Sequence, residues 1–184
     1  MTQNLDASTA ECLVFTEKEG LLSGVAHDLK LRVERFRLRI DDDSVEAEFD
    51  AASLRVVCAR SGSADLPGVL SAKDRAEIET NIAGKVLQTG TYPSIRFRST
   101  SVMAVEGGFR VEGTLTIRGR ERPLVALVRK DGDRAVAECA IHQPDFGIQP
   151  YSAMFGALKV KPGVTVRINA PLATPVMATV GENA

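Results

Sequence analysis

The stretch FRVEGTLTIRGRERPLVAL, residues 109–127, decides the predicted fold. From 109 to 117, apolar side chains occupy odd positions and polar side chains occupy even positions. This period-2 alternation over about nine residues predicts a strand with one dry face and one wet face. Gly113 interrupts the apolar row, which predicts a bend or the close approach of another backbone. Gly119 then marks a turn into a second extended run over 121–128, so the stretch predicts an antiparallel hairpin.

Composition limits the class of protein. The chain has 184 residues, which suits one domain, and its 44% hydrophobic and 26% charged residues are ordinary for a soluble globular protein. The formal net charge is −1, so no global field attracts nucleic acid or an anionic membrane, and we predict no nucleic-acid partner. Apolar runs are only a few residues long, so the chain is not expected to span a membrane.

The N-terminus and the cysteines predict a compartment. Residues 1–10 are polar and are expected to be loose. The first fifteen residues contain neither a basic region nor an apolar run, so we expect no secretion signal. Cys12, Cys58 and Cys139 are an odd number at wide spacings, which fits neither a disulfide framework nor a zinc site. The cytoplasm is therefore the expected location.

A second informative segment spans residues 27–40. Its apolar side chains lie on odd positions at first and on even positions afterwards. The two sets are Leu29, Leu31 and Val33, then Phe36, Leu38 and Ile40. The one-residue phase shift at Glu34-Arg35 predicts a β-bulge or a sharp bend, because otherwise one half would face the wrong side. Long strands that bend in this way are common where a sheet curls into a barrel.

One helix is predicted, over residues 71–88. Ser71 with Asp74 three residues later resembles a capping box, and Gly90 is expected to end the helix. A narrow apolar stripe recurs at i, i+4 and i+8, formed by Ile78, Ile82 and Val86, with Leu87 beside it. Further alternating segments predict strands on both sides of this helix. Many short antiparallel strands with one helix predict an all-β closed barrel, since closure removes unpaired edges.

Four segments, in this order, resemble motifs of the YceI-like (polyisoprenoid-binding, lipocalin-like) family. They are GVAHDL at 24–29, TYPSIRF at 91–97, LTIRG with RPL within 115–124, and DFGI at 145–148. The resemblance implies a lipocalin-like extended antiparallel β-barrel over residues 11–173 with one amphipathic helix, followed by a tail at 174–184. It also implies an apolar interior that holds a long isoprenoid or other lipid chain, and a homodimer.

Two features depart from the family pattern. Many members are exported to the periplasm, whereas no export signal is recognised in this chain. The arginine-aspartate pair that precedes the family's helix is reversed or displaced here, in Lys73-Asp74-Arg75.

Candidate catalytic and metal sites are weak in the sequence. His27 and Asp28 are adjacent, and adjacent residues of a strand point to opposite faces, so a structural role is favoured over a catalytic pair. His142 and Asp145 could meet across a turn, but no serine or cysteine nearby in sequence completes a nucleophilic set. Two histidines and three scattered cysteines do not supply the three or four ligands that zinc needs. We predict no metal and no cofactor.

Alternating arginines predict one charged sheet face. Such a face could bind a phosphate headgroup or nucleic acid, but the balanced net charge favours a solvated face paired with Glu46 and Glu48. The arginines are Arg35, Arg37, Arg39, Arg96 and Arg98.

The inward-facing apolar residues could fill a core or line a ligand cavity, and periodicity cannot separate the two. The resemblance favours a cavity. The predicted apolar ligand site is Leu29, Leu31, Val33, Phe36, Phe97, Phe109, Val111, Leu115, Ile117, Phe146 and Phe155.

The leading hypothesis is a non-catalytic protein that binds, carries or sequesters a polyisoprenoid, quinone tail or fatty acyl chain. The alternatives are a small hydrolase or isomerase that uses His27 or His142, and a structural or interaction barrel with a filled core.

Overall fold

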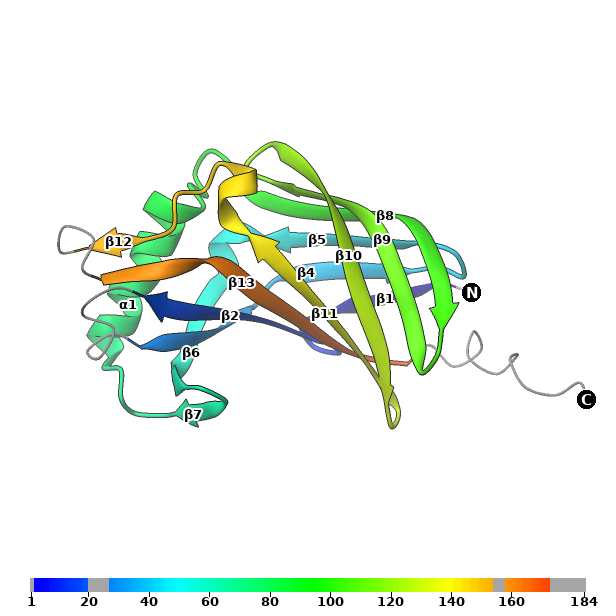
Figure 1. The fold of residues 1–184 in the computed structure, drawn as a ribbon, viewed down its shortest axis with the longest axis horizontal. Helices are drawn as coiled ribbons and strands as arrows, with labels where there is room; N and C mark the ends of the chain where they lie inside the picture. Colours follow the sequence, from blue (N-terminus) through cyan, green and yellow to red (C-terminus); the bar gives the residue numbers. More distant parts are fainter. Residues whose placement is uncertain (1, 20–26, 154–157, 173–184) are drawn as a thin grey trace, which may run out of the picture.

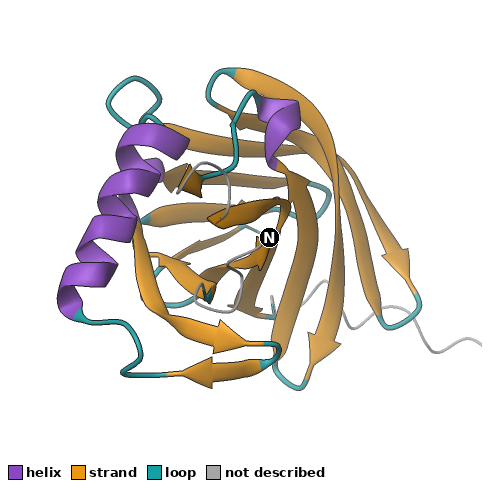
Figure 2. Cartoon of the chain, turned by 60° about the vertical axis from the view of Figure 1, so that its left-hand side comes forward, coloured by secondary structure: helices purple, strands orange, loops and turns teal. Residues whose placement is uncertain are grey.

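The computed structural model describes residues 2–19, 27–153 and 158–172 of the chain. The 13 strands of these residues join in one antiparallel sheet that curls around an interior, and α1 lies at one end (Figures 1 and 2). The strand order is β1-β4-β5-β8-β9-β10-β11-β13-β2-β3-β6-β7, with β12 paired to β13. This architecture confirms the predicted all-β barrel with a helix. The predicted closure is incomplete, because β1 and β7 end the order of the described strands and do not pair with each other.

The elements have the following bounds: β1 (Gln3–Asp6), β2 (Glu11–Glu19), β3 (Asp28–Val33), β4 (Phe36–Ile40), β5 (Val45–Asp50), η1 (Ala51–Ser53), β6 (Leu54–Ser61), β7 (Ala64–Leu66), α1 (Ala72–Asn81), η2 (Ile82–Val86), β8 (Ser94–Val105), β9 (Gly108–Ile117), β10 (Arg120–Asp131), β11 (Arg134–His142), η3 (Gln143–Phe146), β12 (Ser152–Ala153) and β13 (Leu158–Pro171).

The predicted hairpin is present as β9 and β10. These strands pair antiparallel from the Ile117–Arg120 rung to the Gly108–Arg129 rung. The two-residue turn between them is formed by Arg118 and Gly119, with φ angles of 50° and 71°. Positive φ at both central residues gives a twist that matches the flanking strands, which makes the tight connection favourable.

Gly113 allows the close approach that its position predicts. A Cβ atom at this residue would collide with the carbonyl oxygen of Arg98 and with the ring of Phe97 on the neighbouring strand β8. The gap in the apolar row of β9 is therefore filled by an aromatic ring from β8.

The expected bend in the 27–40 segment links the two end regions of the curled sheet. The segment forms β3 and β4, which are separated by Glu34 and Arg35. Strand β3 pairs with β2 and β6, whereas β4 pairs with β1 and β5. One continuous piece of chain thus runs from β3, near one end of the strand order, to β4, near the other end.

Ser53 holds this bend against a second one. It lies at the end of η1, the short turn between β5 and β6, and is fully buried. Its Oγ accepts a hydrogen bond from the backbone nitrogen of Arg35 at 3.0 Å and donates to the backbone oxygen of Asp50 at 2.8 Å. The backbone nitrogen of Glu34 donates to the Ser53 oxygen at 3.1 Å, and that of Asp50 donates to the Arg35 oxygen at 3.0 Å. We call this set of bonds the Ser53 latch.

The expectation of a loose N-terminus is wrong for residues 3–6. These residues form β1, which pairs with β4 from the Gln3–Ile40 rung to the Asp6–Arg37 rung. Leu5 packs into the core beside Leu38, and both side chains are buried. Two sources of stability therefore order this short segment: the free edge of β4 and the burial of one leucine.

The predicted helix is also present. It comprises α1 and a continuing π-helical turn, η2, and Ser71 and Asp74 form the expected capping box. The end differs from the prediction, because the residue with left-handed backbone is Gln88, with a φ of 52°, and not Gly90.

The arginine-rich face is neutralised by its neighbours. Across β4, β5 and β8 the rungs alternate in charge: Glu48 lies between Arg37 and Arg96, and Glu46 lies between Arg39 and Arg98. The closest atoms of the Arg96–Glu48 and Arg98–Glu46 ion pairs lie 3.2 Å and 3.1 Å apart. The predicted paired, solvated face is confirmed.

Strands β10 and β11 pair over only part of their lengths. Their rungs run from Leu127–Glu138 to Asp131–Arg134. Residues 120–126 of β10 and 139–142 of β11 therefore diverge, and η3 lies beside this part of β10.

We predict that Ser53→Ala will lower the free energy of unfolding by about 1–3 kcal/mol, because the backbone nitrogen of Arg35 loses its buried acceptor. Urea unfolding of the purified protein measures this change. The matched control is Ser63→Ala, in the exposed turn between β6 and β7, which should change stability by less than about 0.5 kcal/mol. Equal stability of the Ser53→Ala variant and the wild type would contradict the role of the latch.

Candidate ligand-binding cavity

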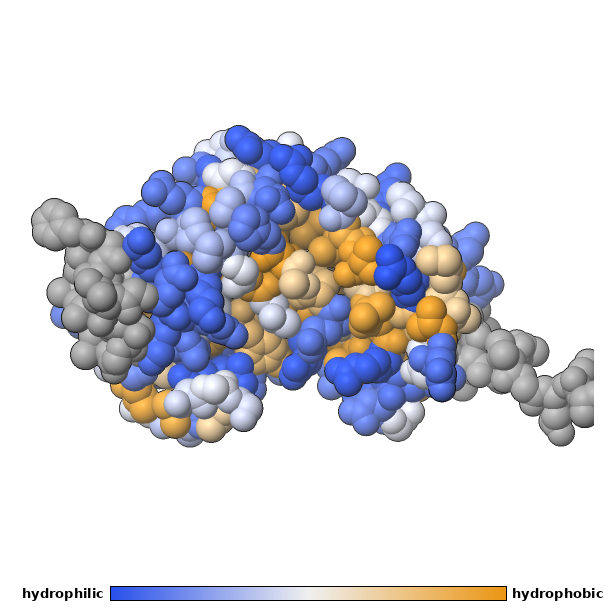
Figure 3. Space-filling model, viewed as in Figure 1, coloured by the Kyte–Doolittle hydropathy of each residue, from blue (hydrophilic) through white to orange (hydrophobic). Residues whose placement is uncertain are grey.

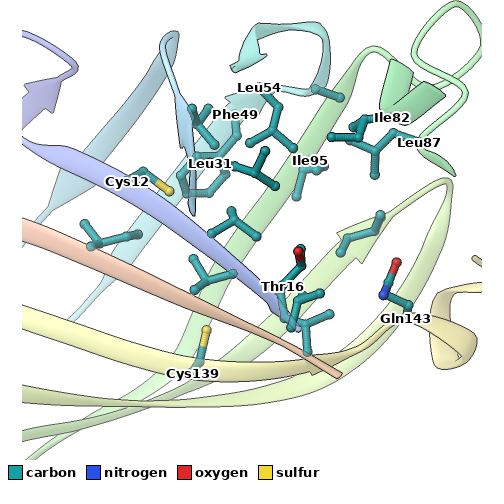
Figure 4. A pocket seen from close by; sticks show the side chains of 18 of the residues that line it. Cys12, Thr16, Leu31, Phe49, Leu54, Ile82, Leu87, Ile95, Cys139 and Gln143 are labelled. Atoms are coloured by element: carbon teal, nitrogen blue, oxygen red, sulfur yellow. The ribbon is translucent and has the colours of Figure 1, made fainter. Parts of the chain in front are cut away.

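The curled sheet surrounds an open-ended cavity of about 710 Å³. This volume falls within the range of roughly 300–1,000 Å³ that ligand sites usually have. The cavity is lined mainly by aliphatic side chains from strands all around the barrel, together with Phe49 and Phe97 (Figure 4). Because successive side chains of a strand point to opposite faces, each alternating row supplies its apolar half to this interior.

Seven of the eleven predicted site residues line the cavity: Leu29, Leu31, Val33, Phe97, Val111, Leu115 and Ile117. The other four are placed differently. Phe36 is buried in the core cluster, where its ring centroid lies 5.8 Å from that of Phe49, and Phe49 itself faces the cavity. Phe146 is buried in a satellite cluster with Leu115 and Ile117. Phe109 is half-buried and does not line the cavity, and Phe155 lies outside the described residues.

Sequence reasoning missed the contribution of the helix to the cavity. The apolar stripe that marks residues 71–88 as a helix faces the cavity. Figure 2 shows the helix beside one end of the curled sheet, and the lining residues of this stripe are Ile78, Ile82, Val86 and Leu87. The periodicity of this stripe was sufficient to identify its inward face. It could not show that the face would meet a cavity and not a packed core.

Several charged lining residues gather at this same end. Asp74 and Glu77 belong to α1, Lys18 lies near the end of β2, and Lys159 lies near the beginning of β13. Figure 1 shows that these parts of β2 and β13 lie at the α1 end of the barrel. We call this region the helix end of the cavity.

Two cysteines indicate the low polarity of the cavity wall. Figure 4 shows the side chains of Cys12 and Cys139 at the cavity wall, and both line it. Burial raises the pKa of Cys12 to about 12, with smaller contributions from the neighbouring Cys139 and Glu11. Burial and the nearby Glu138 raise the pKa of Cys139 to about 11. An environment that disfavours a thiolate this strongly favours apolar ligand groups.

The histidines do not form a catalytic set inside the cavity. His27 is half-buried and lines the cavity, while the neighbouring carboxylate of Asp28 accepts a hydrogen bond from the backbone nitrogen of Lys18 at 2.8 Å. His142 and Asp145 do meet, with 3.0 Å between Nδ1 and Oδ1, but each side chain is more than half exposed and neither lines the cavity. In the part of the chain that the structure describes, no group of three potential metal ligands occurs.

Arg118 connects the hairpin to the helix end. One terminal nitrogen of its guanidinium donates to the Gly147 oxygen and the other to Gln88 Oε1, each at 2.9 Å. The guanidinium carbon also lies 5.7 Å from the centre of the Tyr92 ring. The β9–β10 turn, the segment after the helix and the turn at 145–148 are therefore joined by one side chain.

An antiparallel barrel that curls around an apolar cavity, with a helix at one end, defines a lipocalin-like class of protein. The family model for the YceI-like domain matches residues 6–172, and the chain belongs to this family. No curated protein matches the sequence closely enough to count as a relative. Within the described residues, no helix is long and apolar enough to cross a membrane.

Solved structures share the fold. The crystal structure of BcnA from Burkholderia cenocepacia matches with a TM-score of 0.63 and 15% identity, over 92% of this chain and 99% of that chain. The Campylobacter jejuni YceI protein matches with a TM-score of 0.50 and 13% identity, over 79% of this chain and 85% of that chain. A mutant of that YceI protein gives a TM-score of 0.53 and 14% identity at the same coverage. At these identities the likeness concerns the fold.

We expect the two cavity thiols to be nearly inert in the folded protein. With the pKa of Cys139 raised from 9.0 to about 11, its thiolate fraction at pH 8 should fall about a hundredfold, and that of Cys12 still further. Iodoacetamide labelling, followed by peptide mass spectrometry, measures both rates in buffer and in urea. Labelling in buffer as fast as in urea would contradict a dry cavity wall.

Proposed function

We propose that this protein binds a long apolar molecule in the barrel interior and carries or sequesters it without chemical change. The observation that supports this function most directly is the cavity of about 710 Å³ with its mainly aliphatic lining. A structural barrel with a filled core would need no such volume, because protein interiors are close-packed.

Binding would draw its free energy from burial of the ligand chain. Each methylene transferred from water into an apolar interior contributes about 0.8 kcal/mol. A chain of ten or more carbons therefore binds well with few polar contacts, even after the cost of association. Membership in the YceI-like family supports a polyisoprenoid as the ligand; a quinone tail or a fatty acyl chain would use the same wall.

The arrangement of titratable groups supports a non-catalytic role. The His142–Asp145 pair lies outside the cavity, and among the described residues no hydrogen bond joins His27 to a hydroxyl or thiol group. The free thiols of Cys12, Cys58 and Cys139 fit a reducing compartment such as the cytoplasm. Cytoplasmic location and homodimer formation both stay predictions.

Solvent extraction of the purified protein, followed by mass spectrometry, tests the function directly. We expect a co-purifying lipid, or, if the protein is purified empty, saturable uptake of the fluorescent fatty acid cis-parinaric acid. An empty protein that binds neither this probe nor long-chain isoprenoids would contradict the proposal.

We predict that Val111→Trp will block the cavity with little loss of stability. Val111 is buried on β9 and faces the interior, so the added ring would occupy the space that a ligand chain needs. The control is Val125→Trp on β10, where the side chain is 40% exposed and does not line the cavity.

Probe titrations and thermal melts of both variants measure the effect. We expect lost binding for Val111→Trp and unchanged binding for the control. If the interior were filled, the same substitution would overpack it and cost typically about 1–3 kcal/mol. A large fall in melting temperature, together with no ligand binding by the wild type, would contradict the cavity.

A further inference from the structure

The apolar cavity is bordered by a hydrogen-bond acceptor that the described protein groups leave unused. Gln143 begins η3, lines the cavity and is only 7% exposed. Its Nε2 donates to the backbone oxygen of Lys161 at 3.0 Å. Because a backbone oxygen can only accept, this contact places the amide nitrogen on the Lys161 side and leaves Oε1 on the other. In Figure 4 the Gln143 oxygen points into the cavity, and no described residue donates a hydrogen bond to it.

Thr16 adds a hydroxyl group to the same wall. Val164 of β13 pairs with Thr16 of β2 on one side and with Ile141 of β11 on the other, and Ile141 lies two residues before Gln143. Thr16 lines the cavity, and Figure 4 shows its oxygen directed into the same interior. Among the described residues, none is hydrogen-bonded to Thr16 Oγ1. We call Gln143 and Thr16 the polar spot.

The two groups of the polar spot differ in their hydrogen-bonding capacity. A hydroxyl such as that of Thr16 can donate or accept, whereas the Gln143 oxygen can only accept. When an apolar ligand displaces water from the cavity, an acceptor that is left without a donor carries a desolvation penalty. A ligand that brings a donor to Gln143 removes this penalty, and a ligand that brings only lone pairs does not.

An alcohol group suits the chemistry of both residues. Its hydrogen can be donated to Gln143 Oε1, and its oxygen can accept from a hydroxyl such as that of Thr16. An ether or a quinone carbonyl can accept from Thr16 but places lone pairs against the Gln143 oxygen, and a carboxylate does so with a full negative charge. We infer that the polar spot binds the hydroxyl end of a long-chain alcohol, such as a polyprenol. This inference rests on the proposed function.

The charged groups at the helix end offer the contrasting site, one for an acidic ligand. Lys18 and Lys159 both line that end of the cavity. Lys18 already interacts within the protein, so a ligand carboxylate would compete with an existing contact. An acidic head at these lysines would also leave the Gln143 oxygen without a donor. The polar spot therefore favours a neutral head.

Three ligands with the same isoprenoid chain test this inference: geranylgeraniol, its methyl ether and geranylgeranoic acid. Each is titrated as a competitor of cis-parinaric acid. The ether keeps the oxygen acceptor but lacks the donor, so it isolates the contact to Gln143. We expect the wild type to bind the alcohol about tenfold more tightly than the ether, and more tightly than the acid.

Two variants separate the roles of the two residues. Gln143→Met keeps the length of the side chain but removes the acceptor, so the alcohol and ether affinities should come within about twofold of each other. Thr16→Val removes the hydroxyl donor that serves both ligands, so both affinities should fall by a similar factor while their ratio is kept. Thermal melts establish that each variant is folded.

Several results would overturn the inference. They are equal binding of alcohol and ether by the wild type, tighter binding of the acid, or a preference for the alcohol that survives in Gln143→Met. The wild-type ratio decides the matter even if Gln143→Met does not fold. If the wild type binds none of the three ligands and no cis-parinaric acid, the proposed function fails as well. Equal binding of alcohol and ether leaves the proposed function standing.

Discussion

The interior of this protein depends on the hydrogen bonds that hold two chain bends against each other at Ser53. A sheet of alternating strands has an inherent twist, but twist alone does not bring its two ends together. Here the β3–β4 bend and the η1 turn exchange backbone hydrogen bonds, and the hydroxyl of Ser53 binds both. This contact holds the bend between β3 and β4, so that one continuous segment contributes a strand to each end region of the curled sheet.

The curl of the sheet explains why the apolar rows face a cavity. In a curled sheet, the inward side chains of opposite walls must either meet or leave space between them. Strand β9 shows both outcomes: Leu115 and Ile117 belong to a packed cluster and also border the cavity, whereas Val111 borders the cavity alone. Arg118 then fixes the helix end by binding the segment after η2 and the turn after η3. The helix is thereby held where its apolar stripe completes the lining.

Much of this fold could be predicted from local patterns. The alternation around Gly113, the phase shift at Glu34-Arg35 and the capping box at Ser71 each have a nearby physical cause that the sequence displays. Strand β1 could not be predicted in this way, because only Leu5 marks it and its order comes from the distant edge of β4. Long-range pairing leaves no periodic trace in a segment of four residues.

The site was harder to predict than the fold for a related reason. Alternation shows which side of a strand a residue faces but not its depth or position along the barrel, so Phe36 and Phe146 were expected in the lining although they pack beside it. Gln143 was missed because polar residues near a turn are usually solvated. Only the contact to Lys161 shows that this amide is held inward.

The incomplete pairing of β10 and β11 has a mechanical consequence. Where two strands share a ladder, separating them breaks a series of hydrogen bonds in concert, but residues 120–126 and 139–142 share none with each other. Along this line, the two strands can therefore move apart without breaking a shared ladder. Leu124 and Ile141, which border the cavity on either side of that line, can separate at the expense of side-chain packing alone. A wall of this kind can widen to fit a thicker ligand.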